Sequence, residues 1–194
     1  DMLGETYIEP FAGGAGLALK LLLNEDVSRI VINDFDPAIY SFWHSVLYET
    51  EAFCELIENA ILTTNQWNLQ HSIYLESDTS DPLTLGFATF YLNRTNISGV
   101  VKGGMIGGQG QNGKYGLDAR FNRQTLIEKI KTIASHKEQI VLLNLDAREL
   151  LQPRQLRKFY KIFINLDPPY VKKGAQLYKN AFSESDHREL CELV

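Results

Sequence analysis

Four short apolar segments of this 194-residue chain each lead into an acidic residue. The segments are residues 6–8, 29–32, 140–145 and 162–166, and the acidic residues that follow them are Glu9, Asp34, Asp146 and Asp167. Segments with helical periodicity separate the strands, which favours right-handed crossovers and a largely parallel sheet. Because parallel strands end at one edge, where open α/β sheets bind their ligands, we expect the four acidic residues to share a site.

Between the strands, apolar residues recur at the spacing of amphipathic helices. Helices are predicted over residues 17–23, 37–60 and 123–133, with shorter ones near 67–75, 83–92 and 150–151. Asp36 before Pro37 is typical of an N-cap followed by the first helical residue. Ser183 and Asp186 resemble a capping box, so a further helix is predicted to begin there.

The strand at 162–166 is expected to be buried, and it stops at Asp167-Pro168-Pro169-Tyr170. Two consecutive prolines fix φ and lack an N–H, so neither a helix nor a ladder can continue through them. A carboxylate, carbonyls without neighbouring amide donors and an aromatic ring remain at the end of the strand. This combination suits a flat base that carries an amino group. The oxygens can accept hydrogen bonds from the amino group while the aromatic ring stacks on the face of the base. An ordinary proline turn after a core strand is the alternative.

The first strand leads into a glycine-rich turn, EPFAGGAG, and then into a helix. This geometry lets a ligand approach the backbone closely at a helix N-terminus. Asp34 lies 20 residues after Gly14, about the offset at which an acidic residue reaches a ribose in dinucleotide-type sites. The full G-x-G-x-x-G fingerprint is absent, so a tight turn that uses glycine only for its positive φ remains open.

Residues 62–122 have a different character, with eight glycines between positions 99 and 116. We expect a loop or ribbon outside the sheet. Basic residues (Arg94, Lys102, Lys114, Arg120 and Arg123) are interleaved there with aromatic residues (Tyr91, Tyr115 and Phe121). Such side chains can follow a phosphate backbone and rest against bases. A solvated linker is the alternative.

The composition limits the cellular location and the kinds of site that we expect. No apolar run approaches the roughly 20 residues that span a bilayer, and no basic-then-apolar leader is seen, so we expect a cytoplasmic protein without a membrane partner. Cys54 and Cys191 lack metal-ligand spacing, so we expect buried, reduced thiols and no metal site. The net charge of −5 limits only the average field and is compatible with a local basic groove.

Seven stretches along the chain occur in an order that resembles the DNA adenine methylase family. They are EPFAGGAG, VINDFD, FYLNRTNISG, ARFN, LNLDARELL, NLDPPY and YKNAFSESDHREL. The order is similar to the alpha arrangement of that family, with the cofactor motif first, the target-recognition region next and the catalytic motif last. The resemblance covers nearly the whole chain, and the combination of DPPY, EPFAGG and NRT-x-x-SG makes it specific.

The resemblance implies a Rossmann-like class I methyltransferase with a largely parallel sheet and a mostly helical, glycine-rich target-recognition insertion. The implied enzyme uses S-adenosylmethionine to methylate the exocyclic amine of a flipped adenine in double-stranded DNA, with a restriction endonuclease as a possible cellular partner. The implied domains are a cofactor-binding half (1–61), a target-recognition insertion (62–122) and a catalytic half (123–194).

The same resemblance assigns individual residues. Around the methionine moiety of the cofactor it places Glu9, Pro10, Phe11, Ala12, Gly13, Gly14 and Gly16. Asp34 would bind the ribose hydroxyls of the cofactor. Asp146 and Ala147 would bind the cofactor adenine. The target adenine would be held by the catalytic residues Asp167, Pro168, Pro169 and Tyr170. DNA would contact Asn93, Arg94, Lys102, Lys114 and Arg120.

The chain departs from the family pattern at a few points. Ala15-Gly16 stands where the family usually has a third glycine and a small polar residue. A family segment before the first motif and strands after the catalytic one are missing, so the chain looks like a fragment with a sheet incomplete at both ends. A non-catalytic remnant, a methyltransferase acting on RNA and an NAD-dependent oxidoreductase with a similar glycine turn remain as alternatives.

Overall fold

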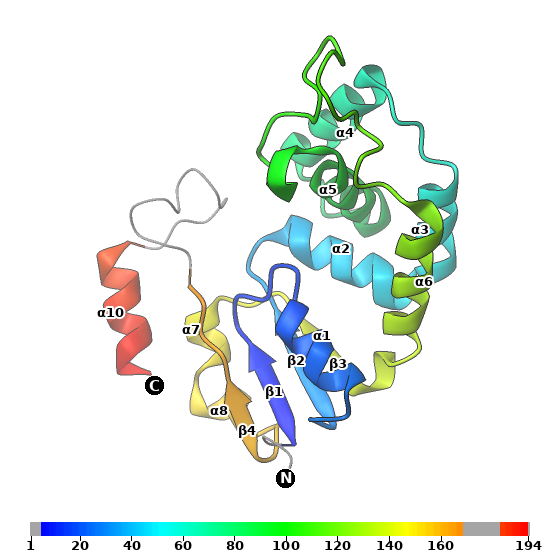
Figure 1. Ribbon diagram of the computed structural model, residues 1–194. Coiled ribbons are helices and arrows are strands. Elements are labelled where there is room, and N and C mark those ends of the chain that lie inside the picture. The colour runs from blue at the N-terminus through cyan, green and yellow to red at the C-terminus, as the bar shows by residue number, and fades with distance from the viewer. Residues whose placement is uncertain (1–4, 169–182, 194) are drawn as a thin grey trace. The chain divides into compact units, whose positions relative to one another are not determined.

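The computed structural model describes residues 5–168 and 183–193 (Figure 1). Pro169 and Tyr170 therefore lie outside the described residues. The chain divides into two compact units. Unit 1 takes in the residues up to Tyr40 and those from His136 onward, and unit 2 is Ser41–Ser135.

Unit 1 is built on a parallel sheet of four strands, as the sequence predicts. The strands are β1 (Thr6–Glu9), β2 (Arg29–Asn33), β3 (Ile140–Leu143) and β4 (Ile162–Ile164), in the spatial order β3-β2-β1-β4. The register places Ile8 of β1 opposite Val31 and Ile164. Because all pairs are parallel, the carboxyl ends of the four strands meet at one edge.

The helices of unit 1 pack their apolar side chains onto this sheet. They are α1 (Gly16–Leu23), α7 (Ala147–Leu150), α8 (Pro153–Leu156) and α10 (Glu184–Glu192), with a 3₁₀ turn, η2, at Lys137–Gln139. Ile8, Val31 and Leu150 are completely buried in one cluster, so α7 covers the middle of the sheet. The predicted capping box of α10 is confirmed, with both Ser183–Asp186 bonds present.

The expectation that β4 is buried was wrong. Ile162 is 37% exposed and Phe163 is 47% exposed. Within the described ranges, β4 pairs only with β1, so it is an edge strand with a neighbour on one side. Phe163 still contacts that neighbour, since its ring stacks on Tyr7 with centroids 5.9 Å apart.

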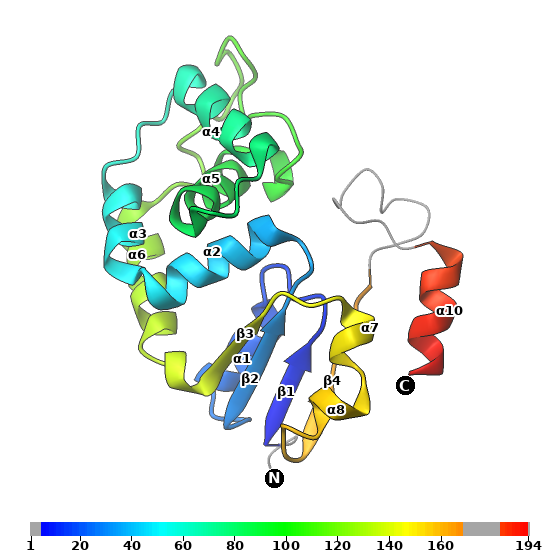
Figure 2. The same ribbon diagram turned by 180° about the vertical axis from the view of Figure 1, so that it is seen from behind.

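Unit 2 is helical (Figure 2). Most of α2 (Pro37–Tyr48) belongs to it, together with α3 (Thr50–Glu58), α4 (Thr64–Glu76), α5 (Pro82–Thr95), the 3₁₀ turn η1 (Ile97–Gly99) and α6 (Arg123–Ala134). Its core is aromatic, and Phe53 lies against Phe42, Phe87 and Phe90 at centroid distances of 6.0, 6.4 and 5.5 Å. The single helix predicted over 37–60 was wrong, because Glu49 leaves helical geometry (φ −126°, ψ 32°) and separates α2 from α3.

Residues 100–122 form successive turns that are anchored by buried side chains. Met105 and Leu117 are buried, and Met105 makes an antiparallel bridge to Asn96. The fully buried Asn96 accepts a hydrogen bond from the Trp67 indole (2.6 Å) and donates to the carbonyls of Val100 (3.0 Å) and Val101 (2.8 Å). One asparagine therefore fixes the start of the glycine-rich segment.

The described residues contain no helix with the length and apolar character that a bilayer crossing requires. Cys54 is buried, whereas Cys191 is exposed, so the expectation that both thiols are buried was wrong for the second. Cys191 follows Leu190, the residue through which α10 reaches the core, and its own side chain lies on the solvent side.

Candidate active site

The acidic residues follow the four strands at one edge of the sheet, in the spatial order Asp146, Asp34, Glu9 and Asp167. Figure 1 shows the strands of unit 1 running side by side toward this edge. An acidic residue at a single strand end would be an ordinary surface turn. Four at neighbouring parallel strand ends make a candidate site with several hydrogen-bond acceptors.

Glu9 is held in a buried position below the glycine-rich turn. It is 5% exposed, and its Oε1 accepts hydrogen bonds from the Tyr7 hydroxyl (3.0 Å) and from the Ala18 amide in the first turn of α1 (3.2 Å). Burial raises the pKa of the Glu9 carboxyl, and the charge of Asp167 raises it further.

The glycine-rich turn leaves open space in front of its backbone. Gly13 has a φ of +48°, which favours glycine. A Cβ added at Gly14 or Gly16 would meet no atom of the protein within 4 Å, so internal packing does not require glycine there. Ala15 takes the left-handed conformation (φ 46°) and is buried, which turns the chain into α1.

The Asp34 side chain is hydrogen-bonded to the glycine-rich turn. Its Oδ2 accepts a hydrogen bond from the Gly13 amide, and its Oδ1 accepts one from the Asp36 amide, both at 2.9 Å. Burial raises the pKa of the Asp34 carboxyl to about 6, although the two amide bonds act in the opposite direction. Each carboxylate oxygen has a further lone pair, so the side chain can still accept a hydroxyl donor from a ligand.

Sequence reasoning missed Asn33, the fully buried neighbour of Asp34. Its Nδ2 donates to the carbonyls of Pro10 (2.9 Å) and Leu145 (3.0 Å), and its Oδ1 accepts the Leu145 amide (2.9 Å). Asn33 therefore joins the loop after β1 to the loop after β3. The only signal in the sequence is a polar residue that ends an otherwise apolar strand.

Asp146 is engaged by a neighbour that the sequence analysis did not consider. Its Oδ1 accepts hydrogen bonds from the Arg148 amide (2.8 Å) and from Arg148 Nε (2.9 Å). Its Oδ2 accepts one from Arg148 Nη2 (2.7 Å). The hydrogen bonds from Arg148 lower the pKa of Asp146. Ala147, also expected to bind the cofactor, is buried at the start of α7.

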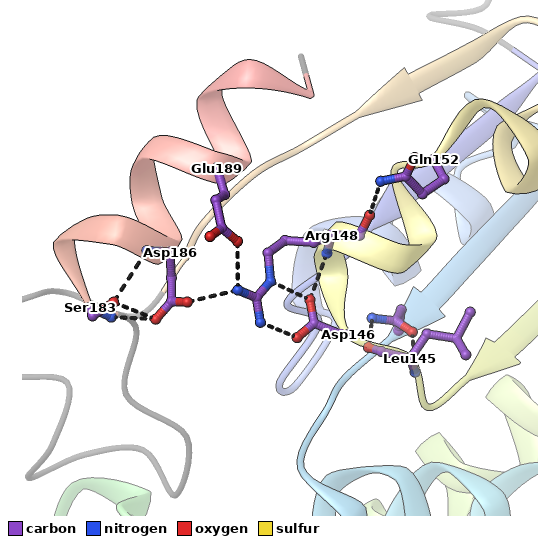
Figure 3. A network of polar contacts seen from close by, with 8 residues as sticks. Leu145, Asp146, Arg148, Gln152, Ser183, Asp186 and Glu189 are labelled. Atoms are coloured by element: carbon purple, nitrogen blue, oxygen red, sulfur yellow. Dashed lines mark hydrogen bonds and ion pairs between the residues drawn. The ribbon is translucent and has the colours of Figure 1, made fainter.

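Arg148 also reaches α10 (Figure 3). Its Nη1 lies 2.7 Å from Asp186 Oδ1 and 2.9 Å from Glu189 Oε2. We call Arg148, Asp146, Asp186 and Glu189 the Arg148 cluster. In this cluster one guanidinium links the end of β3 to the C-terminal helix and holds the carboxylate of Asp146 in a fixed orientation.

Asp167 lies three residues beyond the end of β4. The Asn165 amide still bonds to the Ile8 carbonyl at 2.9 Å, and Leu166 packs against the cluster of Ala147 and Leu151. Asp167 itself is exposed and Pro168 is half-buried. The approach to Asp167 is therefore anchored, while its carboxylate is accessible.

Three of the five residues expected to contact DNA are brought together in unit 2. Asn93, Arg94 and Arg120 are joined by hydrogen bonds. Lys102 and Lys114 lie on exposed turns, and the Lys114 ammonium sits 5.4 Å from the centre of the Tyr115 ring. The glycine-rich segment therefore presents its basic residues in two different ways, one anchored and one exposed.

Comparison with known proteins gives one clear assignment. No curated protein matches the chain significantly. A sequence model of the D12 class N6 adenine-specific DNA methyltransferases matches residues 2–194, which is nearly the whole chain. With the parallel α/β sheet and the acidic strand ends already described, this match shows that the chain belongs to the D12 class N6 adenine-specific DNA methyltransferase family, whose members are enzymes that methylate adenine in DNA.

Proposed function

We propose that the chain transfers the methyl group of S-adenosylmethionine to the exocyclic amine of an adenine that has been flipped out of double-stranded DNA. The observation that carries the proposal is the row of acidic residues at adjacent strand ends. The middle of this row, Glu9 and Asp34, meets the open glycine-rich turn, and one end of it is the Asp167-Pro168 segment. These are the two kinds of surface that a methyl donor and an amine acceptor need.

The residues at the glycine-rich turn fit the proposed cofactor. The open space at Gly14 and Gly16 admits a ligand close to the backbone, and Asp34 offers acceptor lone pairs to ribose hydroxyls. Glu9, Pro10, Phe11, Ala12 and Gly13 would surround the methionine moiety, with Asp146 and Ala147 near the adenine. When bound, S-adenosylmethionine supplies an electrophilic methyl group on a sulfonium.

Asp167 would act on the acceptor amine. The lone pair of an adenine amine is delocalised into the ring, so the protein must expose and orient it. Flipping the base costs on the order of a few kcal/mol. The Asp167 carboxylate and the Pro168 carbonyl would accept hydrogen bonds from the two N–H groups of the amine, which favours a tetrahedral nitrogen, and one of these protons would leave the nitrogen during or after the transfer. Positioning of this kind can contribute roughly 7–11 kcal/mol of barrier reduction.

Pro169 and Tyr170 complete the proposed base site, with the tyrosine ring stacking on the adenine. We further propose that residues 62–122 act as the target-recognition region between the cofactor-binding half (1–61) and the catalytic half (123–194). Within it, Asn93, Arg94, Lys102, Lys114 and Arg120 would contact DNA, since basic side chains supply most of the affinity for duplexes. A restriction endonuclease is the proposed partner in the cell.

The test is Asp167→Ala. Because the Asp167 side chain is exposed, the variant should fold, bind S-adenosylmethionine in calorimetry like the parent chain and lose transfer of labelled methyl groups to DNA. Asp34→Ala is the matched control and should lose cofactor binding. Equal loss of binding and transfer in Asp167→Ala would contradict the assignment of Asp167.

A further inference from the structure

Two arginines of unit 2 are held side by side by a single asparagine. The carbonyl oxygens of Asn93 and Asn96 each lie 3.3 Å from Arg120 Nη1. The Oδ1 of Asn93 accepts hydrogen bonds from Nε of Arg94, at 2.9 Å, and from its Nη2. The Asn93 side chain is fixed in turn, because its Nδ2 donates to the Gly99 carbonyl at 2.8 Å. We call Arg94 and Arg120 the arginine pair.

Gly99 sets the position of Arg120. It has a φ of +72°, and an added Cβ would lie 2.9 Å from Nη1 and 3.0 Å from Nη2 of Arg120. Any side chain at position 99 would therefore displace the guanidinium. The arginine pair is thus built by a glycine that makes room and an asparagine that supplies acceptors, and it does not consist of two unconstrained surface side chains.

The arginine pair lacks a carboxylate partner. Across residues 5–168 and 183–193, neither Arg94 nor Arg120 forms an ion pair. Burial and the charge of Arg120 both lower the pKa of Arg94, so the two cations repel each other. The protein oxygens they do contact are neutral, and each guanidinium has more N–H donors than these contacts use.

We propose that Arg94 and Arg120 together bind one backbone phosphate of the acceptor duplex. A phosphate supplies the negative charge that the pair lacks and several acceptor oxygens, which match the planar donors of guanidinium groups. Reading of a guanine edge would occupy one arginine in a bidentate contact and leave the other without a counterion. The pair therefore fixes where the duplex lies on unit 2 and does not read its sequence.

This inference rests on the proposed DNA-binding role and is tested through the salt dependence of binding. The full 194-residue chain is titrated with a short fluorescent DNA duplex at several KCl concentrations. Arg94→Gln and Arg120→Gln should each weaken binding with little change in the slope of log affinity against log salt, because the remaining arginine still neutralises the shared phosphate. The double variant should reduce that slope by about 1, because the phosphate is then no longer neutralised.

Three control variants separate the loss of a phosphate contact from a change in total charge or in fold. Lys129→Gln removes one exposed cation of α6 and should leave the slope unchanged. Arg120→Lys keeps the charge and should keep the slope with weaker affinity, which also covers the case that Arg120→Gln does not fold. Gly99→Ala keeps both charges and should weaken binding by displacing Arg120, and its melting temperature is measured alongside, because alanine is strained at a φ of +72°.

Several results would overturn the phosphate assignment while leaving the methyltransferase assignment intact. An unchanged slope in the double variant, with a parent chain that binds and methylates DNA, is one. A loss confined to particular DNA sequences would indicate base reading, and a double variant that loses about 2 slope units would indicate two phosphates. A parent chain that neither binds nor methylates DNA would overturn the proposed function and this inference together.

Discussion

The side chain of Asn33 pairs with the backbone of Leu145, 112 positions later, in both directions. Its Nδ2 donates to the Leu145 carbonyl at 3.0 Å and its Oδ1 accepts the Leu145 amide at 2.9 Å. The same side-chain amide also reaches Pro10. The loops that carry the proposed cofactor contacts on either side of β2 are therefore held by one buried residue.

Replacing Asn33 by alanine should destabilise unit 1 strongly. The change leaves buried backbone groups of Pro10 and Leu145 without partners, and we expect the free energy of unfolding to fall by about 3 kcal/mol. Asn144→Ala is the matched control, because Asn144 is exposed and loses one bond to the Asp34 carbonyl. Chemical denaturation measures both, and similar losses in the two variants would contradict the role given to Asn33.

Gly14→Val should weaken cofactor binding without harming the fold. Its side chain would enter the open space before the turn and collide with a bound ligand, so we expect about a tenfold loss of S-adenosylmethionine affinity. Gly86→Ala is the contrasting variant, because its Cβ would lie 2.5 Å from the Ser41 carbonyl oxygen and should lower the melting temperature. Calorimetry and thermal melting distinguish the two effects, and unchanged affinity in Gly14→Val would count against the cofactor site.

Cofactor affinity should depend on pH through Asp34. Its pKa is raised to about 6 by burial, so the ionised acceptor is lost as pH falls below that value. We expect affinity for S-adenosylmethionine to fall by up to about tenfold per pH unit below pH 6. Asp34→Asn cannot titrate and should bind weakly with a flat profile, whereas a parallel decline in that variant would assign the pH dependence to another group.

Asp34 should affect stability with the opposite trend. Its pKa in the folded chain lies above the ordinary value of 3.8, so its contribution to stability is present in full below about pH 4 and is lost as pH rises through about 6. The difference in free energy of unfolding between the parent chain and Asp34→Asn, measured by denaturation of the free protein, should therefore change in favour of Asn as pH increases. A difference that stays constant between pH 4 and 7 would be inconsistent with the raised pKa.

Asp186→Ala should loosen α10 more than Glu189→Ala does. Asp186 both completes the capping box with Ser183 and pairs with Arg148 at 2.7 Å, while Glu189 pairs with Arg148 at 2.9 Å and is more exposed. Hydrogen exchange of the α10 amides measures the loosening. Ser183→Ala removes the cap alone, and if it matches Asp186→Ala in full, the bond to Arg148 contributes nothing measurable.

The strands and most helices could be predicted because their signals are local. The runs at 6–8, 29–32 and 140–145 contain enough apolar and β-branched residues to identify strands, and their separation by helices implies the parallel order; the third strand ends at Leu143, two residues earlier than predicted. The break at Glu49 was missed because the apolar spacing continues through it. The exposure of Phe163 was missed because a strand's own sequence does not state how many neighbours it has.

The acidic residues of the site could be found by position, but their partners could not. Asn33 depends on a residue 112 positions away, and Asp146 is engaged by Arg148, which reaches in turn to α10. The arginine pair was expected as separate DNA contacts. Its shared support by Asn93, and the space left by Gly99, arise only when the end of α5 meets the turn before α6.

The edge position of β4 affects how stably the chain positions Asp167. β4 is the shortest of the four described strands, and within residues 5–168 and 183–193 it pairs on one side only, so its opening requires less free energy than that of β1 or β2 at the centre of the sheet. Opening of β4 would displace the segment that leads to Asp167. Under the role proposed for Asp167, backbone hydrogen bonds added along the outer side of β4 should therefore raise catalytic turnover without touching the carboxylate itself.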